Sequence, residues 1–170
     1  MVERFYPNFY FESVEKIPYS FFKENGINAV IFDMDNTLVN SKYVLTEKVK
    51  KWLLGLKNEN VKICILSNSP RLSKVEKIGK EFDIPFLHKA LKPWAFGFKK
   101  AINVLDEDKK SIAIIGDQIF TDIYGGNRFG IKTVLVKPIE KSEFVTTKMK
   151  RPLENYILKR YRKDVKKEEV

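Results

Sequence analysis

The sequence of 170 residues contains one cysteine, Cys64, and one histidine, His88. A single cysteine excludes a disulfide framework and cannot by itself form a zinc site. Long hydrophobic runs are also missing, because stretches such as residues 27–32 are far shorter than the roughly 20 residues that a transmembrane helix needs. The first residues include Glu3 and Arg4 and do not resemble a secretory signal. We therefore expect a cytoplasmic protein, and peripheral attachment to the inner face of the membrane stays open.

Positive charge is in excess over the whole chain. The 32 Lys and Arg residues outnumber the 22 Asp and Glu residues, which gives a net charge of +10 at pH 7. Residues 148–170 hold nine basic and four acidic residues, so half of the excess lies there. Such a segment favours a polyanion, either nucleic acid or anionic lipid, although a solvated helix face fits equally well. We expect a domain at residues 1–147 and a basic helix or tail at residues 148–170.

Short apolar runs alternate with amphipathic segments along the chain. The apolar runs predict strands at residues 29–33, 61–66, 84–87, 112–115 and 133–136. The spacing of apolar residues predicts helices at residues 47–57, 72–82, 94–105 and 121–129. Short apolar strands that alternate with helices are typical of a parallel sheet covered on both faces. We therefore predict an α/β fold with a doubly wound, five-stranded parallel sheet.

The helix ends and the tryptophans give further expectations. Thr46 is a predicted N-cap, Pro93 is expected in the first turn of the third helix, and Gly130 is expected to end the fourth. Trp52 and Trp94 fall on apolar helix faces, which predicts that both lie in the core.

Residues capable of chemistry follow four of the predicted strands. Asp33 and Asp35 follow the first strand, Ser67 follows the second, Lys92 comes after the third and Asp117 follows the fourth. Ligands of doubly wound sheets bind beyond the carboxyl ends of the strands. We therefore expect these side chains to converge on one edge of the sheet.

The acidic residues of this group predict a metal site. Asp33, Asp35, Asp117 and Asp122 would place three or four carboxylates in a small space, where they repel each other unless a cation lies between them. Ligands that are all oxygens suit a hard divalent cation, and Mg²⁺ fits best because it leaves positions for water and phosphate oxygens. We therefore predict Mg²⁺ as the cofactor.

The remaining polar residues indicate phosphate chemistry. Lys92 and the hydroxyls of Thr37 and Ser67 could hold a phosphate opposite the metal. One carboxylate could then attack phosphorus while a second shuttles a proton, as in enzymes that form aspartyl-phosphates. These features predict a hydrolase of phosphate monoesters.

Four short motifs resemble those of the haloacid dehalogenase (HAD) superfamily, in the order of that family. Asp33-Met-Asp-Asn-Thr-Leu is similar to its first motif, Leu-Ser67-Asn to its second, Lys92-Pro to its third and GDQIFTD at residues 116–122 to its fourth. A single such motif would be weak, whereas four in order make chance agreement improbable. The resemblance implies a HAD-like Rossmannoid fold.

Longer runs resemble one subfamily. Residues 31–39 and 116–130 are similar to the YqeG subfamily of capless, class IIIA HAD phosphatases, and the likeness covers roughly residues 5–140. Residues 39–45 and 88–91 are too few to hold a cap domain, so the site should be open and suit a phosphate carried by something large. The YqeG group resembles mitochondrial enzymes that dephosphorylate phosphatidylglycerophosphate, which implies a lipid headgroup as the substrate.

The resemblance also implies roles at the matching positions. Asp33 would be the nucleophile and a Mg²⁺ ligand. Asp35 would protonate the leaving oxygen, activate water and offer its backbone carbonyl to the metal. Asp117 would hold Mg²⁺ directly or through water, with support from Asp122. The implied phosphate-binding residues are Thr37, Ser67, Asn68 and Lys92, and Lys92 would also neutralise Asp33.

The basic tail fits a lipid substrate. Five apolar residues fall near one helical face, with lysines and arginines around them: Met149, Leu153, Tyr156, Ile157 and Tyr161. That pattern is typical of a helix that lies on an anionic membrane, and equally of a helix that packs on the domain.

Rival functions differ in what they leave unexplained. A protein, nucleotide or sugar phosphate is the alternative substrate. A nucleic-acid-binding module would use the basic charge but would not need acidic residues at strand ends. A receiver domain would carry its acidic residue after the third strand, where Leu87 is followed by His-Lys-Ala. A hydrolase is therefore the favoured interpretation.

Overall fold

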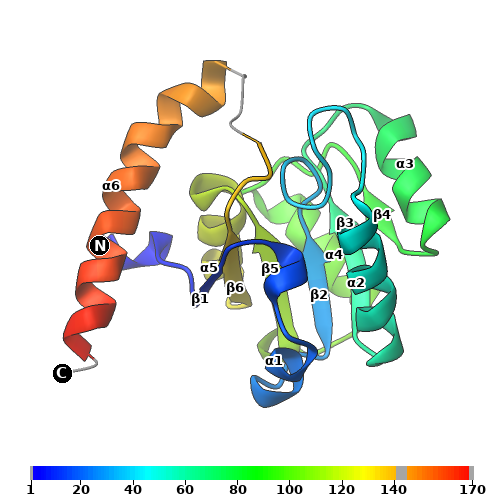
Figure 1. Cartoon of the computed structure of the whole chain (residues 1–170), viewed down its shortest axis with the longest axis horizontal. Helices are drawn as coiled ribbons and strands as arrows, with labels where there is room; N and C mark the ends of the chain where they lie inside the picture. The colour runs from blue at the N-terminus through cyan, green and yellow to red at the C-terminus, as the bar shows by residue number, and fades with distance from the viewer. Residues whose placement is uncertain (1, 141–144, 169–170) are drawn as a thin grey trace.

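The structure is a computed structural model in which residues 2–140 and 145–168 are described. Its sheet has the strand order β1-β6-β5-β2-β3-β4, and every neighbouring pair is parallel (Figure 1). The strands are β1 Phe9–Phe11, β2 Ala29–Phe32, β3 Lys62–Leu66, β4 Phe86–Leu87, β5 Ile112–Gly116 and β6 Lys132–Val136. The doubly wound α/β fold is confirmed, and the sheet has six strands instead of the predicted five.

The additional strand, β1, comes from a segment with little strand signal. It is only three residues long and pairs with β6 through Phe9 and Val134. Asn8 fixes its start, because the Thr133 backbone N–H donates to Asn8 Oδ1 at 2.8 Å and the Asn8 backbone N–H donates to the Thr133 carbonyl at 3.0 Å. Three half-buried aromatic residues in a row show no period-two pattern, so the sequence did not predict this strand.

The helices lie on both faces of the sheet (Figure 1). They are α1 Tyr19–Glu24, α2 Glu47–Asn58, α3 Leu72–Glu81, α4 Ala95–Leu105, α5 Tyr124–Phe129 and α6 Val145–Glu168. Thr46 caps α2 as predicted, since its hydroxyl accepts from the Val49 backbone N–H at 3.3 Å. Pro93 lies outside α4, so its predicted place in the first turn is wrong. The predicted helix at 121–129 is a π-helical turn, Ile119–Ile123, followed by α5, and Gly130 ends it with φ +67°.

Side chains of the central strands β2, β3 and β5 alternate between two cores. Val30 and Phe32 of β2 belong to the cluster under α1, α2 and α3, whereas Ala29 and Ile31 belong to the cluster under α4. All four are completely buried. Burial on both faces explains why the central strands read as continuous apolar runs.

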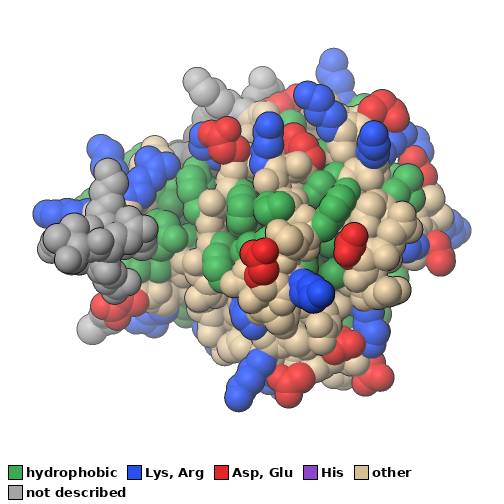
Figure 2. All heavy atoms as spheres, turned by 60° about the horizontal axis from the view of Figure 1, so that its bottom comes forward, with side chains coloured by type: hydrophobic (Ala, Val, Ile, Leu, Met, Phe, Trp, Pro, Cys, Tyr) green, Lys and Arg blue, Asp and Glu red, His purple; other side chains and the backbone are tan. Residues whose placement is uncertain are grey.

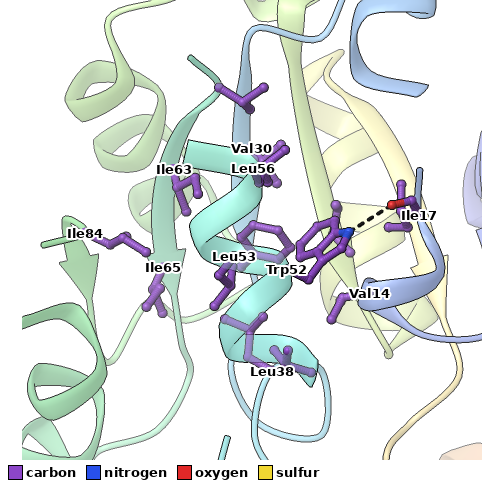
Figure 3. Packing of buried hydrophobic residues seen from close by; sticks show 14 of the residues in the cluster. Val14, Ile17, Val30, Leu38, Trp52, Leu53, Leu56, Ile63, Ile65 and Ile84 are labelled. Atoms are coloured by element: carbon purple, nitrogen blue, oxygen red, sulfur yellow. Dashed lines mark hydrogen bonds between the residues drawn. The ribbon is translucent and has the colours of Figure 1, made fainter. Parts of the chain in front are cut away.

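Trp52 of α2 is central to the first core (Figure 3). Its ring packs among buried residues, and Nε1 donates to the Ile17 carbonyl at 2.9 Å. The prediction of a core position is confirmed for Trp52 and wrong for Trp94, which is 65% exposed. Trp94 is the residue before α4 begins, so the helical spacing that seemed to align it with Phe98 does not apply to it.

Replacing Trp52 with Phe should destabilise the fold. The change leaves the buried Ile17 carbonyl without its indole donor and removes part of the packed ring, which together should lower the free energy of unfolding by about 2 kcal/mol. Urea denaturation measures it. Trp94→Phe is the matched control and should change stability little, because its ring is mostly in solvent. Equal losses in the two variants would contradict the placement of the two rings.

Helix α6 packs on the β1/β6 edge of the domain (Figure 1). The Tyr6 hydroxyl donates to Asp164 Oδ2 at 2.8 Å, and the rings of Tyr6 and Tyr161 lie 5.5 Å apart. Ile157 is buried in a cluster that includes Ile119 of the π-helical turn. The stretch predicted as a basic helix or tail is therefore helical where it is described, and the boundary between 1–147 and 148–170 stays a prediction.

The predicted apolar face of this helix is split in two. Ile157 turns toward the domain, and Tyr161 contacts Tyr6, whereas Leu153 and Tyr156 are 54% and 53% exposed. The inward side is set by contacts with the N-terminal segment, which the helical spacing alone could not foresee. Met149 lies outside the side chains that the structure describes. Within the described residues, no helix combines the length and the apolar composition that crossing a membrane requires.

Candidate active site

The site lies where the strand order reverses. The chain runs from β2 outward to β3 and β4, and then returns to the other side of β2 as β5. Phe32 and Ile115 are therefore register partners, and the Asp33 backbone N–H donates to the Ile115 carbonyl at 2.9 Å. Because both strands run parallel, Asp33 and Asp117 emerge side by side at their carboxyl ends, as expected at such a switch point.

Three buried carboxylates meet there, and two of them contact one ammonium group. Asp33, Asp117 and Asp122 each offer an oxygen within 4.8 Å of the other two. Lys92 Nζ lies 2.5 Å from Asp33 Oδ1 and 2.8 Å from Asp122 Oδ1, and the lysine side chain is 1% exposed. Asp122 Oδ2 accepts a further hydrogen bond from the Gln118 backbone N–H at 3.1 Å. The structure thus brings together residues from the first, third and fourth motifs.

Burial and neighbouring charges shift the pKa values of Asp33 and Lys92. Burial raises the pKa of Asp33 to about 7, opposed by the Lys92 ammonium and reinforced by the Asp122 carboxylate. Burial lowers the pKa of Lys92, but the carboxylates of Asp122 and Asp33 outweigh it and raise that pKa above its ordinary value. Lys92 therefore stays charged at neutral pH, whereas the Asp33 carboxylate takes up a proton more readily than an ordinary aspartate does.

The donor set fits a divalent cation. All three clustered side chains offer carboxylate oxygens, which hard cations prefer. Asp33 Oδ2 is buried and has no hydrogen-bond partner within the described part of the chain, so an acceptor is left for a cation. The Asp35 carboxylate is not part of this cluster. These contacts support a divalent metal site at Asp33, Asp117 and Asp122.

The hydroxyl residues lie at the same edge. Ser67 Oγ donates to Asp35 Oδ2 at 3.1 Å and accepts from the Ser69 backbone N–H at 3.0 Å. Thr37 Oγ1 is buried and has no hydrogen-bond partner among the described residues. The Asp35 carboxylate is thus held by the second-motif loop, and Thr37 keeps a hydroxyl for a ligand oxygen.

Asn68 contacts the loop that carries Lys92. Its Oδ1 accepts from the Lys92 backbone N–H at 2.7 Å, and its Nδ2 donates to the Lys92 carbonyl at 3.1 Å. This reciprocal pair locks the third-motif loop to the second-motif loop. The phosphate-binding role implied for Asn68 stays a prediction, and its observed contacts serve to place Lys92.

Two contributing residues were missed by sequence reasoning. Asn36 lies in the first-motif loop with φ +66°. Its carbonyl accepts from the Ile139 backbone N–H at 3.0 Å, and its Oδ1 accepts from the Glu140 backbone N–H at 3.2 Å. The segment after β6 therefore holds the first-motif loop in place. An asparagine in a tight turn is the signal that could have indicated this. Glu154 of α6 is 4% exposed, and its Oε1 accepts from the Ile119 backbone N–H at 3.2 Å. Nothing in a basic tail marks one acidic residue as inward-facing.

Gly116, directly before Asp117, offers a test of the cluster. A Cβ at this position would lie 2.3 Å from Asp122 Oδ2, so Gly116→Ala should displace that carboxylate. We expect the affinity for divalent cations to fall about 10- to 100-fold, measured from the metal dependence of hydrolysis and by calorimetry. Gly79→Ala is the control, since its Cβ would meet Phe86 instead and should cost stability without changing metal affinity. Unchanged affinity in Gly116→Ala would contradict the assignment of Asp122.

No cap domain covers the site. Residues 33–46 between β2 and α2, all of them described, contain neither a helix nor a strand beyond one bridge between Asp35 and Val39. Residues 88–94 between β4 and α4 likewise contain no further element. The predicted absence of an inserted domain at these two places agrees with the structure.

Known proteins are similar to this chain in sequence. The family model described as "Mitochondrial PGP phosphatase" matches residues 2–140. The probable phosphatase YqeG of Bacillus subtilis is 32% identical over 160 residues, covering 93% of this chain and 92% of that protein. Phosphatidylglycerophosphate phosphatase 1 of Arabidopsis thaliana is 28% identical over 169 residues, covering 91% of this chain and 47% of that protein, about half its length.

A solved structure agrees at the level of the fold. An uncharacterized protein from Listeria monocytogenes serotype 4b superposes with a TM-score of 0.54 and 23% identity, covering 70% of this chain and 86% of that one. The family match over most of the chain confirms the resemblance seen in the four motifs. This chain belongs to the mitochondrial PGP phosphatase family and is a YqeG-like phosphatase of the HAD superfamily.

Proposed function

We propose that the protein is a Mg²⁺-dependent phosphomonoester hydrolase that acts through an aspartyl-phosphate on Asp33. The observation that carries this proposal is the buried group of Asp33, Asp117 and Asp122, two of which pair with the Lys92 ammonium. The buried Thr37 and Ser67 hydroxyls lie at the same edge. Mg²⁺ bound there would neutralise charge on the phosphoryl oxygens and on Asp33.

The chain's own residues would share two steps. In the first, an Asp33 oxygen attacks phosphorus, the bond from phosphorus to the leaving oxygen breaks, and Asp35 as the acid gives that oxygen a proton. In the second, Asp35 as the base takes a proton from water, the water oxygen attacks phosphorus, and the bond to Asp33 breaks to release phosphate. Ser67 donates to the Asp35 carboxylate and so holds it in place for both steps. The Lys92 ammonium would stabilise charge on the phosphoryl group.

The proposed substrate is phosphatidylglycerophosphate, which yields phosphatidylglycerol. The family match and the named activity of the Arabidopsis relative support this choice. The short loops over the site support it as well, because a headgroup in a membrane surface needs access from outside. A protein, nucleotide or sugar phosphate is the alternative, and a nucleic-acid-binding role would leave the acidic cluster unused.

A phosphate-release assay separates these substrates. Phosphatidylglycerophosphate in vesicles is compared with soluble monoesters, each with and without Mg²⁺. We expect Mg²⁺-dependent release with a higher kcat/KM for the lipid. A higher kcat/KM for a soluble ester would replace the lipid assignment, and release that ignores divalent cations would overturn the metal assignment.

We also propose that α6 contacts an anionic membrane surface, which would place the protein peripherally on the inner face. Basic side chains lie at the side of the molecule where α6 is found, and also over the rest of the face seen in Figure 2. Its exposed residues include Leu153 and Tyr156 and four basic ones, Lys159, Arg160, Arg162 and Lys163. Each basic residue near such a surface contributes about 1 kcal/mol.

Charge removal tests this better than deletion, because Glu154 and Ile157 anchor α6 to the domain. Changing Lys159, Arg160 and Lys163 together to Gln should weaken binding to phosphatidylglycerol vesicles about 100-fold in a flotation assay. The control changes three exposed lysines elsewhere, Lys48, Lys51 and Lys109. Equal binding of both triple variants would remove α6 as a membrane contact.

A further inference from the structure

The segments around the active site expose several large apolar side chains. We call them the rim: residues 40–45, 70–74 and 88–96, which follow β2, β3 and β4 at their carboxyl ends (Figure 1). Among the described residues, the three most exposed large hydrophobic side chains are Trp94 at 65%, Leu91 at 61% and Phe96 at 59%. All three lie close to Lys92 in the sequence, and the Lys92 ammonium is buried against Asp33. Exposed apolar side chains that gather at one place mark a surface that contacts something.

Apolar residues from two segments of the rim line one hollow. Leu72, at the start of α3, is 43% exposed and lines a hollow of about 340 Å³ together with Phe96. The same hollow is bordered by Leu87 and Ala90. The segments after β3 and β4 therefore present Leu72 and Phe96 to the same hollow, and the second of these segments also carries Lys92.

Basic side chains surround this apolar surface. The Arg71 guanidinium and the Lys74 ammonium lie 5.9 and 5.3 Å from the centre of the Tyr43 ring, and Lys100 Nζ lies 4.3 Å from the centre of the Phe96 ring. A second hollow, of about 200 Å³, is lined by four lysines and one acidic residue: Lys42, Lys50, Lys74, Lys77 and Glu81. Glu81 is already paired with Lys50, so the hollow keeps an excess of positive charge.

Exposed aromatic rings mixed with lysine and arginine suit the boundary between lipid headgroups and acyl chains. We propose that the rim docks on an anionic bilayer and holds the catalytic pocket against the headgroup layer, with Leu91, Trp94 and Phe96 inserted between the lipids. The charge of the rim favours anionic lipid over a neutral surface. This proposal rests on the proposed lipid substrate and adds the surface through which that substrate is reached.

The test changes Trp94 and Phe96 together to Gln and leaves the catalytic residues intact. Wild-type protein should float with vesicles that contain phosphatidylglycerol and much less with pure phosphatidylcholine. The double variant should bind the anionic vesicles at least about tenfold more weakly, and its kcat/KM for phosphatidylglycerophosphate in those vesicles should fall by a similar factor. Its hydrolysis of p-nitrophenyl phosphate should stay unchanged. Leu54→Gln with Val104→Gln, two exposed apolar residues outside the rim, is the matched control and should behave as wild type.

Tryptophan fluorescence gives a direct second readout. The chain has two tryptophans, and Trp52 is buried, so a shift of emission to shorter wavelength on adding anionic vesicles should come from Trp94. Trp94→Phe should lose the shift. Undiminished vesicle binding by the double variant would overturn the proposal. A wild-type dimer in solution that the double variant no longer forms would also overturn it, because the rim would then bind a second copy of the chain. If wild type binds vesicles through the rim but cleaves only soluble esters, the substrate assignment fails and the docking surface stands.

Discussion

Asp33→Asn should abolish turnover while the protein stays folded. Asparagine keeps the shape of the side chain but cannot form the acyl-phosphate, and loss of a nucleophile of this kind lowers kcat by at least about 10⁴-fold. The fold should survive, because Lys92 keeps Asp122 as its partner when the Asp33 charge is lost, and repulsion among the buried carboxylates falls. Phosphate release and thermal unfolding measure the two effects.

A covalent readout separates this role from simple metal binding. Rapid acid quenching of wild type during turnover should trap a phosphorylated protein, with the label on the peptide that contains Asp33. Asp117→Asn should lower the affinity for Mg²⁺ but still allow labelling when Mg²⁺ is saturating. Asp33→Asn should give no label at any Mg²⁺ concentration. Turnover by Asp33→Asn at the wild-type rate would sink the assigned nucleophile.

Lys92→Met should have the largest effect on stability. The ammonium lies between Asp33 and Asp122 in a buried space, and methionine would leave these carboxylates without their cation. Removing one partner of a buried charged group costs about 3–5 kcal/mol, so the free energy of unfolding without divalent cation should fall by that amount. kcat should also fall about 10²- to 10³-fold, because a donor to the phosphoryl group is lost.

The effect of added Mg²⁺ on the melting temperature should show whether Lys92 balances the charge of the buried carboxylates. If Lys92 balances the carboxylates, Mg²⁺ should raise the melting temperature of Lys92→Met by more than it raises that of wild type. Lys62→Met removes a partly exposed pair with Glu107 and is the control, with a stability change below about 1 kcal/mol. A Lys92→Met protein as stable as wild type in the absence of divalent cations would contradict this account.

Much of the fold and of the site followed from local sequence pattern. Apolar runs located the five central and flanking strands, because burial on both faces leaves little room for polar residues. The pairing of Asp33 with Asp117 followed from the rule that ligands bind where strand order reverses, which the neighbouring β2 and β5 confirm. These features depend on short segments and on the order of the strands, so a single sequence was enough to predict them.

What the sequence did not indicate depends on contacts between distant segments. β1 exists because Asn8 and Thr133 exchange hydrogen bonds, and Asn68 contacts the backbone of Lys92 rather than pointing only at a ligand. Glu154 reaches the fourth-motif loop from the far end of the chain. Trp94 was misplaced because a helix boundary moved by one residue changes which side chains share a face.

The pairing of β1 with β6 has a consequence for how the nascent chain matures. Phe9–Phe11 is synthesised well before its partner Lys132–Val136, because the other four strands lie between the two along the chain. Until then, three aromatic residues have no sheet edge to join, and such segments are prone to aggregate or to recruit chaperones. The strands β2 to β5, whose carboxyl ends lead into the catalytic residues, can assemble before β6 and β1 add to the sheet beyond β5.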